Sequence, residues 1–209
     1  FYLALTILMP LLRHRYVSGS WPITFHKGAD PFQAFIGIQL TVALMLGGVW
    51  AVTLPHVSAA SLHLMNTSPW VTVTGWYLLL AGALFEVFSQ RYVGRSFRVG
   101  NDTERTDLIT TGPFWIMRNP VFTGLIVALA GIVLITPSPY TIMGFVWITS
   151  LIHIQVRLEE AHMFAMHTGR YARYARRTGR FLPGLGRLTH HTGEPATLQR
   201  GDRSSLSRV

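Results

Sequence analysis

The chain has 209 residues, of which 49% are hydrophobic and only 13% are charged, and its net charge is +9. The apolar residues gather in long uncharged stretches, which is typical of a polytopic membrane protein and not of soluble domains. The sequence contains no cysteine, so disulfides and thiolate chemistry are excluded.

Five apolar segments predict membrane-spanning helices, so the expected fold class is an all-α polytopic membrane helix bundle with a helical C-terminal segment. A turn of two prolines and one serine separates the last two segments and predicts a tight hairpin. In chain order the segments are Phe1–Leu12, Pro31–Leu54, Pro69–Gln90, Val121–Thr136 and Tyr140–Val156.

All 18 lysines and arginines fall in three regions, Arg13–Lys27, Arg91–Arg118 and Arg157–Arg208. With five spans these regions share one side of the membrane, and the positive-inside rule places that side in the cytoplasm. The N-terminus is then outside and the C-terminus inside. Anionic lipid headgroups account for the basic residues, so we expect no nucleic-acid partner. All but one of them are arginine, which is typical of a GC-rich bacterial genome. We therefore expect a bacterial cytoplasmic membrane.

Small residues recur at helical spacing in two of the apolar segments and share one helix face in each. Such stripes let two membrane helices approach closely, so they predict packing faces in preference to ligand sites. The stripes are Gly75 with Gly82, and Gly124 with Ala128 and Gly131.

Glu86 is the one acidic residue inside an apolar segment. Carboxylates within a membrane are costly and are usually functional. Glu86 also lies about one turn from Arg91, where its side chain could reach interfacial water. The sequence leaves both interpretations open.

Residues 108–124, LITTGPFWIMRNPVFTG, join a polar loop to an apolar helix. Thr110–Pro113 predict a turn, Asn119 predicts an N-cap, and Pro120 predicts the first turn of a helix. The free N–H groups of such a helix start attract carboxylates and other anions. A well-capped membrane helix without a ligand is the simpler alternative.

After Val156 the chain becomes amphipathic, and Gly169 predicts a break before the helix resumes over Arg170–Arg177. A hairpin of the last two spans would bring the helix start at Pro120 to face Glu160 and Arg157. Such a pocket offers N–H groups and Arg to a carboxylate, Glu to an ammonium, and nearby aromatic rings to a sulfonium. The alternative is an interfacial Arg/Glu network that anchors helix ends.

We expect no metal site, because the three histidines of this region do not stack on one helix face and no cysteine is present. These residues are His153, His162 and His167.

Several short motifs follow one another in the second half of the chain, at residues 108–114, 118–124, 159–160, 169–174 and 180–183. Their sequences are LITTGPF, RNPVFTG, EE, GRYARY and RFLP. In this order and spacing they resemble the isoprenylcysteine carboxyl methyltransferase family and the related phospholipid methyltransferases. The resemblance covers about residues 75–185.

The resemblance implies one integral-membrane methyltransferase domain at residues 1–188, with its cofactor-binding half at 91–185. A polar tail at 189–209, with the composition of a flexible segment, would follow. The resemblance also implies an S-adenosylmethionine site on the cytoplasmic side and a substrate-anchoring role for Arg157. The residues that match the family's cofactor contacts are Gly100, Thr106, Asp107, Leu108, Ile109, Phe114, Asn119, Pro120, Val121, Phe122 and Glu160.

The motifs depart from the family pattern at three points. Asn119 stands where many members have His, and Phe122 stands where Tyr is usual, so a hydroxyl is lost. Arg157 precedes Glu160 by three residues where the eukaryotic enzymes have four, a spacing that keeps both on one helix face.

The expected function is methyl transfer from S-adenosylmethionine to a lipophilic acceptor, with carboxyl O-methylation of an isoprenylcysteine-like substrate as its specific form. The expected partners are membrane lipids and a lipophilic small-molecule or prenylated acceptor that enters from the bilayer. Two alternatives remain open. One is a membrane NADPH-dependent sterol or enone reductase, whose phosphate site the Arg-rich segment 170–180 could supply, and the other is a non-enzymatic membrane scaffold.

Overall fold

The computed structural model describes residues 31–53, 68–93 and 108–188, together with residues 12, 15, 16, 56 and 65. The described part consists of four long helices and one short 3-10 helix, and it contains no β-strand. The elements are α2 (Pro31–Thr53), α3 (Pro69–Val93), η4 (Gly112–Trp115), α4 (Pro120–Ile135) and α5 (Pro139–Arg177). Apart from Leu12, the predicted span Phe1–Leu12 lies outside the described residues, as does the tail 189–209.

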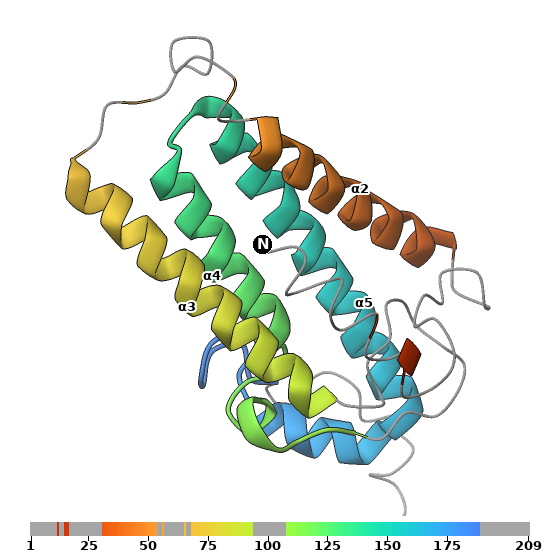
Figure 1. The fold of residues 1–209 in the computed structure, drawn as a ribbon. Coiled ribbons are helices and arrows are strands. Elements are labelled where there is room, and N and C mark those ends of the chain that lie inside the picture. The colour runs from red at the N-terminus through yellow and green to blue at the C-terminus, as the bar shows by residue number, and fades with distance from the viewer. Residues whose placement is uncertain are drawn as a thin grey trace, which may run out of the picture.

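The four long helices lie side by side in the order α3, α4, α5, α2, and helices that follow one another in the chain run in opposite directions (Figure 1). Each begins within one residue of a predicted span, so the positions of these four apolar helices are confirmed. Helices α3 and α5 are long and apolar enough to cross a membrane, whereas α4 and the Ala34–Trp50 part of α2 are shorter apolar helices. At 1.5 Å per residue α4 is roughly 24 Å long, shorter than the ~30 Å hydrocarbon core.

The close contact of α3 with α4 rests on the predicted stripes of small residues. A Cβ atom added to Gly82 would lie 2.5 Å from the backbone nitrogen of Ala128 and 2.6 Å from the carbonyl oxygen of Gly124. One added to Gly75 would lie 2.8 Å from the carbonyl oxygen of Gly131. The two backbones therefore touch along this seam, and the prediction that both stripes are packing faces is confirmed.

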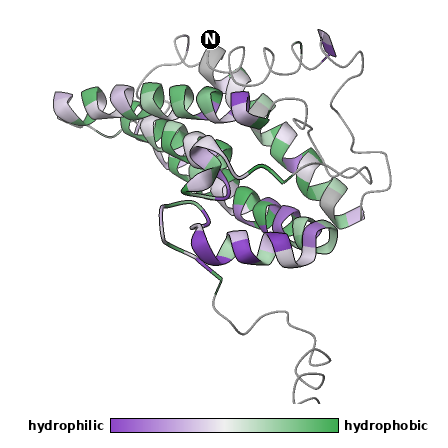
Figure 2. Cartoon of the chain, turned by 90° about the horizontal axis from the view of Figure 1, so that it is seen from below, coloured by the Kyte–Doolittle hydropathy of each residue, from purple (hydrophilic) through white to green (hydrophobic). Residues whose placement is uncertain are grey.

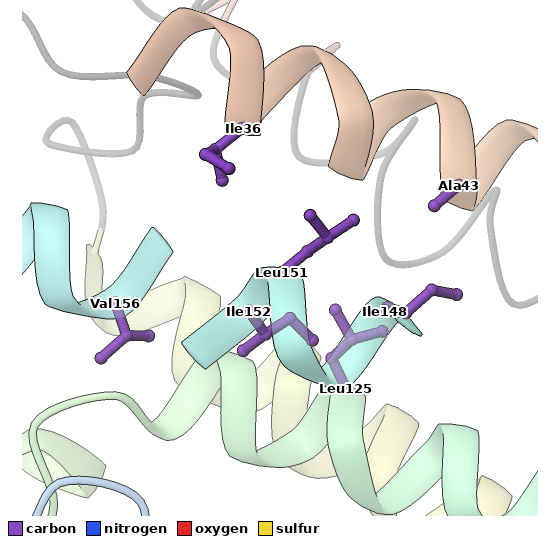
Figure 3. Close-up of a cluster of buried hydrophobic side chains, with 7 residues drawn as sticks. All are labelled: Ile36, Ala43, Leu125, Ile148, Leu151, Ile152 and Val156. Atoms are coloured by element: carbon purple, nitrogen blue, oxygen red, sulfur yellow. The ribbon is translucent and has the colours of Figure 1, made fainter. Parts of the chain in front are cut away.

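Helix α5 joins α2 to α4 through a cluster of buried apolar side chains (Figure 3). Ile36 and Ala43 of α2 meet α5 on one side, and Leu125 of α4 belongs to the same cluster. The members from α5 are Ile148, Leu151, Ile152 and Val156.

At Thr168 helix α5 bends, with φ 20° and ψ −99°, one residue before the predicted break at Gly169. The part after the bend runs across the end of the bundle where α3 ends and α4 begins (Figure 1). Hydrophilic residues gather on this part, whereas the bundle helices are mostly hydrophobic (Figure 2). The bend therefore turns a membrane-type helix into a polar segment that covers one end of the bundle.

Replacement of Gly82 by Ala should weaken the α3–α4 contact, because the new methyl group would overlap the α4 backbone. We expect the free energy of unfolding in detergent micelles to fall by about 1–3 kcal/mol. The matched control is Gly144→Ala in α5, where an added Cβ has no atom within 4 Å. Equal losses in both variants would contradict a backbone contact at Gly82.

Candidate active site at the polar end of the bundle

Two chain segments far apart in sequence pair at the polar end of the bundle. The loop before α4 and the segment after α5 form a short parallel bridge between Met117 and Gly179. The amide of Arg118 donates to the carbonyl of Gly179 at 2.8 Å, and the amide of Asn119 donates to that of Arg180 at 3.1 Å. The RNP and RFLP motifs therefore meet in space.

The carboxylate of Glu160 lies at the centre of this junction. Its Oε1 accepts from Nε of Arg118 at 2.9 Å and from Nδ2 of Asn119 at 3.3 Å. Its Oε2 accepts from Nη2 and Nε of Arg180 at 2.8 and 3.1 Å. Glu160 is 6% exposed, so this is a buried carboxylate whose four acceptor positions are all used.

The side chain of Arg118 makes four hydrogen bonds, as many as Glu160, and only 1% of it is exposed. Besides Glu160, its guanidinium donates to three backbone carbonyls, those of Ala175 at 2.9 Å, Thr178 at 2.6 Å and Gly186 at 3.0 Å. These carbonyls come from the end of α5 and the segment that follows it. Arg118 therefore holds the C-terminal segment against the start of α4.

The η4 turn is fixed from the same side by Tyr174, whose hydroxyl donates to the carbonyl of Phe114. Burial raises the pKa of Tyr174 to about 12, so its hydroxyl stays protonated at neutral pH. Gly112 begins this turn with φ 60°, a left-handed conformation that favours glycine. The backbone conformation of the LITTGPF motif therefore depends on the left-handed Gly112 and on the hydrogen bond from the Tyr174 hydroxyl.

Glu159 lies beyond the predicted span, which ends at Val156, and its environment differs from that of its neighbour Glu160. Its Oε1 accepts from Nε2 of Gln155 at 2.9 Å, and no salt bridge pairs it with an arginine among the described residues. Burial raises the pKa of Glu159 to about 7; the hydrogen bond from Gln155 opposes this shift and the charge of Glu160 adds to it. Its carboxyl group is therefore poised to exchange a proton near neutral pH.

The structure brings part of the predicted site together. Asn119 and Glu160 are in contact, Pro120 begins α4 as predicted, and Phe114 lies in η4 beside Tyr174. The remaining described residues are half-buried in the segment before η4 or in the first turn of α4; they are Leu108, Ile109, Val121 and Phe122. Gly100, Thr106 and Asp107 lie outside the described residues.

Two expectations about this site need correction. Asn119 stands at the N-cap position of α4, but its side chain makes no capping hydrogen bond, because its amide donates to Glu160 and to the carbonyl of Arg180. The predicted pocket beside Pro120 and Glu160 contains polar side chains of the protein itself, because Asn119, Arg118 and Arg180 all donate to Glu160. Arg157 is exposed and is not among the side chains that contact Glu160.

From the sequence, Arg118 received no role, and Tyr174 and Arg180 were considered only within the Arg-rich segment of the reductase alternative, although each lies in a motif. Arginine is usually exposed, so a single sequence gives no sign that Arg118 is buried. The residue in the sequence that could have indicated a close contact in this segment is Gly179. In the structure, a Cβ added to Gly179 would lie 1.8 Å from the carbonyl oxygen of Leu182. A glycine between Arg177 and Arg180 indicates a close backbone contact at that point.

Replacement of Glu160 by Gln should destabilise the protein strongly, because Arg118 would stay buried without its counter-charge. We expect the free energy of unfolding to fall by about 3–5 kcal/mol. The matched variant Arg180→Gln should cost only about 1 kcal/mol, since this guanidinium is 30% exposed and Arg118 still pairs with Glu160. Denaturant titration in mixed micelles measures the free energy of unfolding of both variants. Equal losses in the two variants would contradict the central position of Arg118.

Glu159 should make stability depend on pH. Its folded-state pKa of about 7 lies above the ordinary value of 4.5, so the folded state favours the protonated form. The resulting stabilisation is fully present below pH about 4.5 and is lost as pH rises to about 7. We expect the unfolding temperature to fall between pH 5 and 7, and to fall less in Glu159→Gln. The test is the difference between the two proteins, and identical pH profiles would contradict the assignment.

Comparisons with known proteins agree with the motif pattern. The sequence profile of the phospholipid methyltransferase family matches residues 70–169. A solved structure of a eukaryotic intramembrane Ras methyltransferase, isoprenylcysteine carboxyl methyltransferase, aligns with a TM-score of 0.56 and 16% sequence identity. The alignment covers 90% of this chain and 67% of the other. A comparison with curated proteins found no significant match.

The chain shares its fold with that solved structure, and the family match covers α3, α4 and most of α5. The family match spans residues 70–169, and the solved structure is 16% identical, so the structural likeness concerns the fold. The resemblance to isoprenylcysteine carboxyl and phospholipid methyltransferases that the sequence motifs predicted is therefore confirmed.

Proposed function

We propose that this protein transfers a methyl group from S-adenosylmethionine to a lipophilic acceptor at the polar end of the bundle. The observation that carries the proposal is the junction at Glu160, which draws the RNP motif, the Glu pair and the RFLP motif into one place. These are the segments that resemble the cofactor-binding half of the family. A scaffold would not require this convergence of motif residues.

The residues present fit the cofactor in part. The guanidinium of Arg180 is partly exposed and can meet a carboxylate, and the ring of Phe114 can contact an adenine or a sulfonium. Glu160 has no free acceptor, so a direct contact with the cofactor's ammonium would require Arg180 to move away. We therefore assign Glu160 first to positioning Arg118 and Arg180, and its direct contact with the cofactor stays a prediction.

The proposed cofactor surface includes the other residues that match the family. Leu108 and Ile109 would border it before η4, and Asn119 to Phe122 would border it at the start of α4. Gly100, Thr106 and Asp107 belong to the same proposal on the resemblance alone. The bound cofactor would supply a methyl group on a sulfonium, which is already a good leaving group. The chain would then contribute alignment and the exclusion of water.

We propose five spans, with the polar end of the bundle in the cytoplasm of a bacterial cell. The described helices support this arrangement, because Arg91, Arg118 and the Arg-rich part of α5 gather at one end (Figure 1).

Carboxyl O-methylation of an isoprenylcysteine-like acceptor is the specific reaction that the resemblance proposes. Arg157 is exposed and would be available to an acceptor carboxylate.

Isothermal titration of the purified protein with S-adenosylmethionine and with NADPH tests the proposal. We expect S-adenosylmethionine to bind and NADPH not to bind. Replacement of Phe114 by Ala should weaken binding of S-adenosylmethionine by at least about tenfold, equivalent to a lost contact of about 1.4 kcal/mol. Trp115→Ala is the matched control, because this neighbouring ring is 74% exposed. Preferred binding of NADPH would favour a reductase, and binding of neither would favour a scaffold.

A further inference from the structure

The segment after α5 folds back on itself in a tight turn over residues 181–187. The amide of Arg180 donates to the carbonyl of Leu185 at 2.7 Å, and the amide of Leu185 donates to the carbonyl of Leu182 at 3.2 Å. Gly184 has φ 78°, a left-handed conformation that favours glycine. Hydrogen bonds and a left-handed glycine therefore define the shape of this turn.

The turn presents apolar side chains outward. Leu182 is 52% exposed and Leu185 is 63% exposed, and Pro183 between them is exposed as well. A single exposed leucine is ordinary on a protein surface, but these three residues form one apolar surface on a turn of defined shape. Turns that face water are usually built from polar residues and glycine, so this surface indicates apolar surroundings.

The turn lies at the level where the apolar bundle begins. The carbonyl of Gly179 accepts from the amide of Arg118, and the carbonyl of Arg180 accepts from the amide of Asn119, which directly precedes α4. Figure 1 shows this segment, in blue, at the end of the bundle where α4 begins. The exposed leucines are therefore within reach of the lipid that surrounds the apolar helices.

Arginines flank the apolar surface of the turn. Residues 169–188 include six arginines and no acidic residue. Arg187 is exposed at the end of the turn, and the amide of Leu188 donates to the carbonyl of Ala175 at 3.1 Å. This bond brings the end of α5, with its exposed Arg176, beside the turn. Apolar side chains flanked by arginine are typical of segments that lie in the interface of an anionic membrane.

The backbone of the turn also belongs to the ion cluster. The carbonyl of Gly186 accepts from Nη2 of Arg118 at 3.0 Å. The carbonyl of Leu185 accepts from the amide of Arg180, whose guanidinium binds Glu160. A change in the shape of the turn therefore reaches both arginines that pair with Glu160.

We propose that the turn at residues 181–187 inserts into the membrane interface, with Leu182 and Leu185 among the lipid chains. Arg176 and Arg187 then bind the anionic phosphates of the lipid head groups, and the docked turn holds the ion cluster in place. A soluble acidic protein could match the arginines, but it would not explain leucines carried at the membrane boundary. The proposal concerns a lipid-binding surface and does not depend on the methyl transfer proposed above.

Because the sequence contains no cysteine, a single introduced cysteine can report the depth of the turn. Leu185→Cys is labelled with a nitroxide in nanodiscs of phosphatidylcholine and phosphatidylglycerol in equal parts. We expect the label to collide more with oxygen, which concentrates in lipid, than with a water-soluble nickel chelate. Met143→Cys is the lipid reference, because Met143 is 69% exposed in the apolar part of α5. Preference for the chelate at Leu185 would overturn the insertion and favour a soluble acidic partner.

Isothermal titration in maltoside micelles tests the head-group contact with three probes: dihexanoylphosphatidylglycerol, dihexanoylphosphatidylcholine and inorganic phosphate. We expect phosphatidylglycerol to bind most tightly, and Arg187→Gln to weaken it about fivefold, as expected for one interfacial arginine. Arg170→Gln is the matched control, since it makes the same change at an exposed arginine near the bend of α5. Equal affinity for the two lipids, phosphate bound as tightly as phosphatidylglycerol, or equal losses in both variants would overturn the proposal.

The unfolding temperature in nanodiscs measures the link to the ion cluster. Replacing pure phosphatidylcholine by the mixed lipids should raise the unfolding temperature of the wild type, and the double variant Leu182→Ser, Leu185→Ser should lose most of this rise. Both leucines are exposed, and the unfolding temperature in maltoside micelles is the folding control. An equal rise in both proteins would contradict the link. Titration with S-adenosylmethionine on the same samples reports separately on methyl transfer, and its failure leaves the lipid result standing.

Discussion

The buried ion cluster of Arg118, Glu160 and Arg180 holds the polar end of this protein together. Arg118 and Glu160 are buried and Arg180 is partly exposed; burial of charges is costly, and such clusters often contribute little net stability compared with apolar packing. This cluster joins the start of α4 to α5 and to the segment after it, with backbone carbonyls completing the donors of Arg118. It therefore specifies how three distant motifs meet, and it leaves a net positive charge beside the proposed cofactor surface.

The close α3–α4 seam determines where that cluster lies. Because Gly82 and Gly124 bring the two backbones into contact, α3 and α4 form a tight pair, and Glu86 is buried along it with Gln90 donating to its carboxylate at 3.2 Å. Glu86 thus lies inside the bundle, so the interpretation that it simply reaches interfacial water is not supported. Helix α4 has 16 residues, and its first turn lies at the end of the bundle beside the ion cluster.

The helix starts, the small-residue seam and the bend of α5 could be predicted from the sequence because each depends on local chemistry. Proline begins α3, α4 and α5, and glycine stripes follow a simple helical period. The contacts of Asn119 and Arg118 could not be predicted in this way. Asn119 is a good cap in isolation, but a buried carboxylate nearby competes for its amide. The carbonyl partners of Arg118 come from residues up to 68 positions away, and no local pattern encodes such a distance.

Glu159 and Glu160 show how adjacent carboxyl groups acquire different chemistry from their surroundings. Adjacent positions on a helix point about 100° apart, so Glu160 turns toward the two arginines while Glu159 lies on the face of α5 that carries Gln155. Glu160 accepts four hydrogen bonds from charged and amide donors, whereas Glu159 accepts one from Gln155. Enzymes commonly separate the roles of two carboxyl groups by separating their environments. On this argument Glu160 builds the site, and Glu159 is the group free to exchange a proton within it.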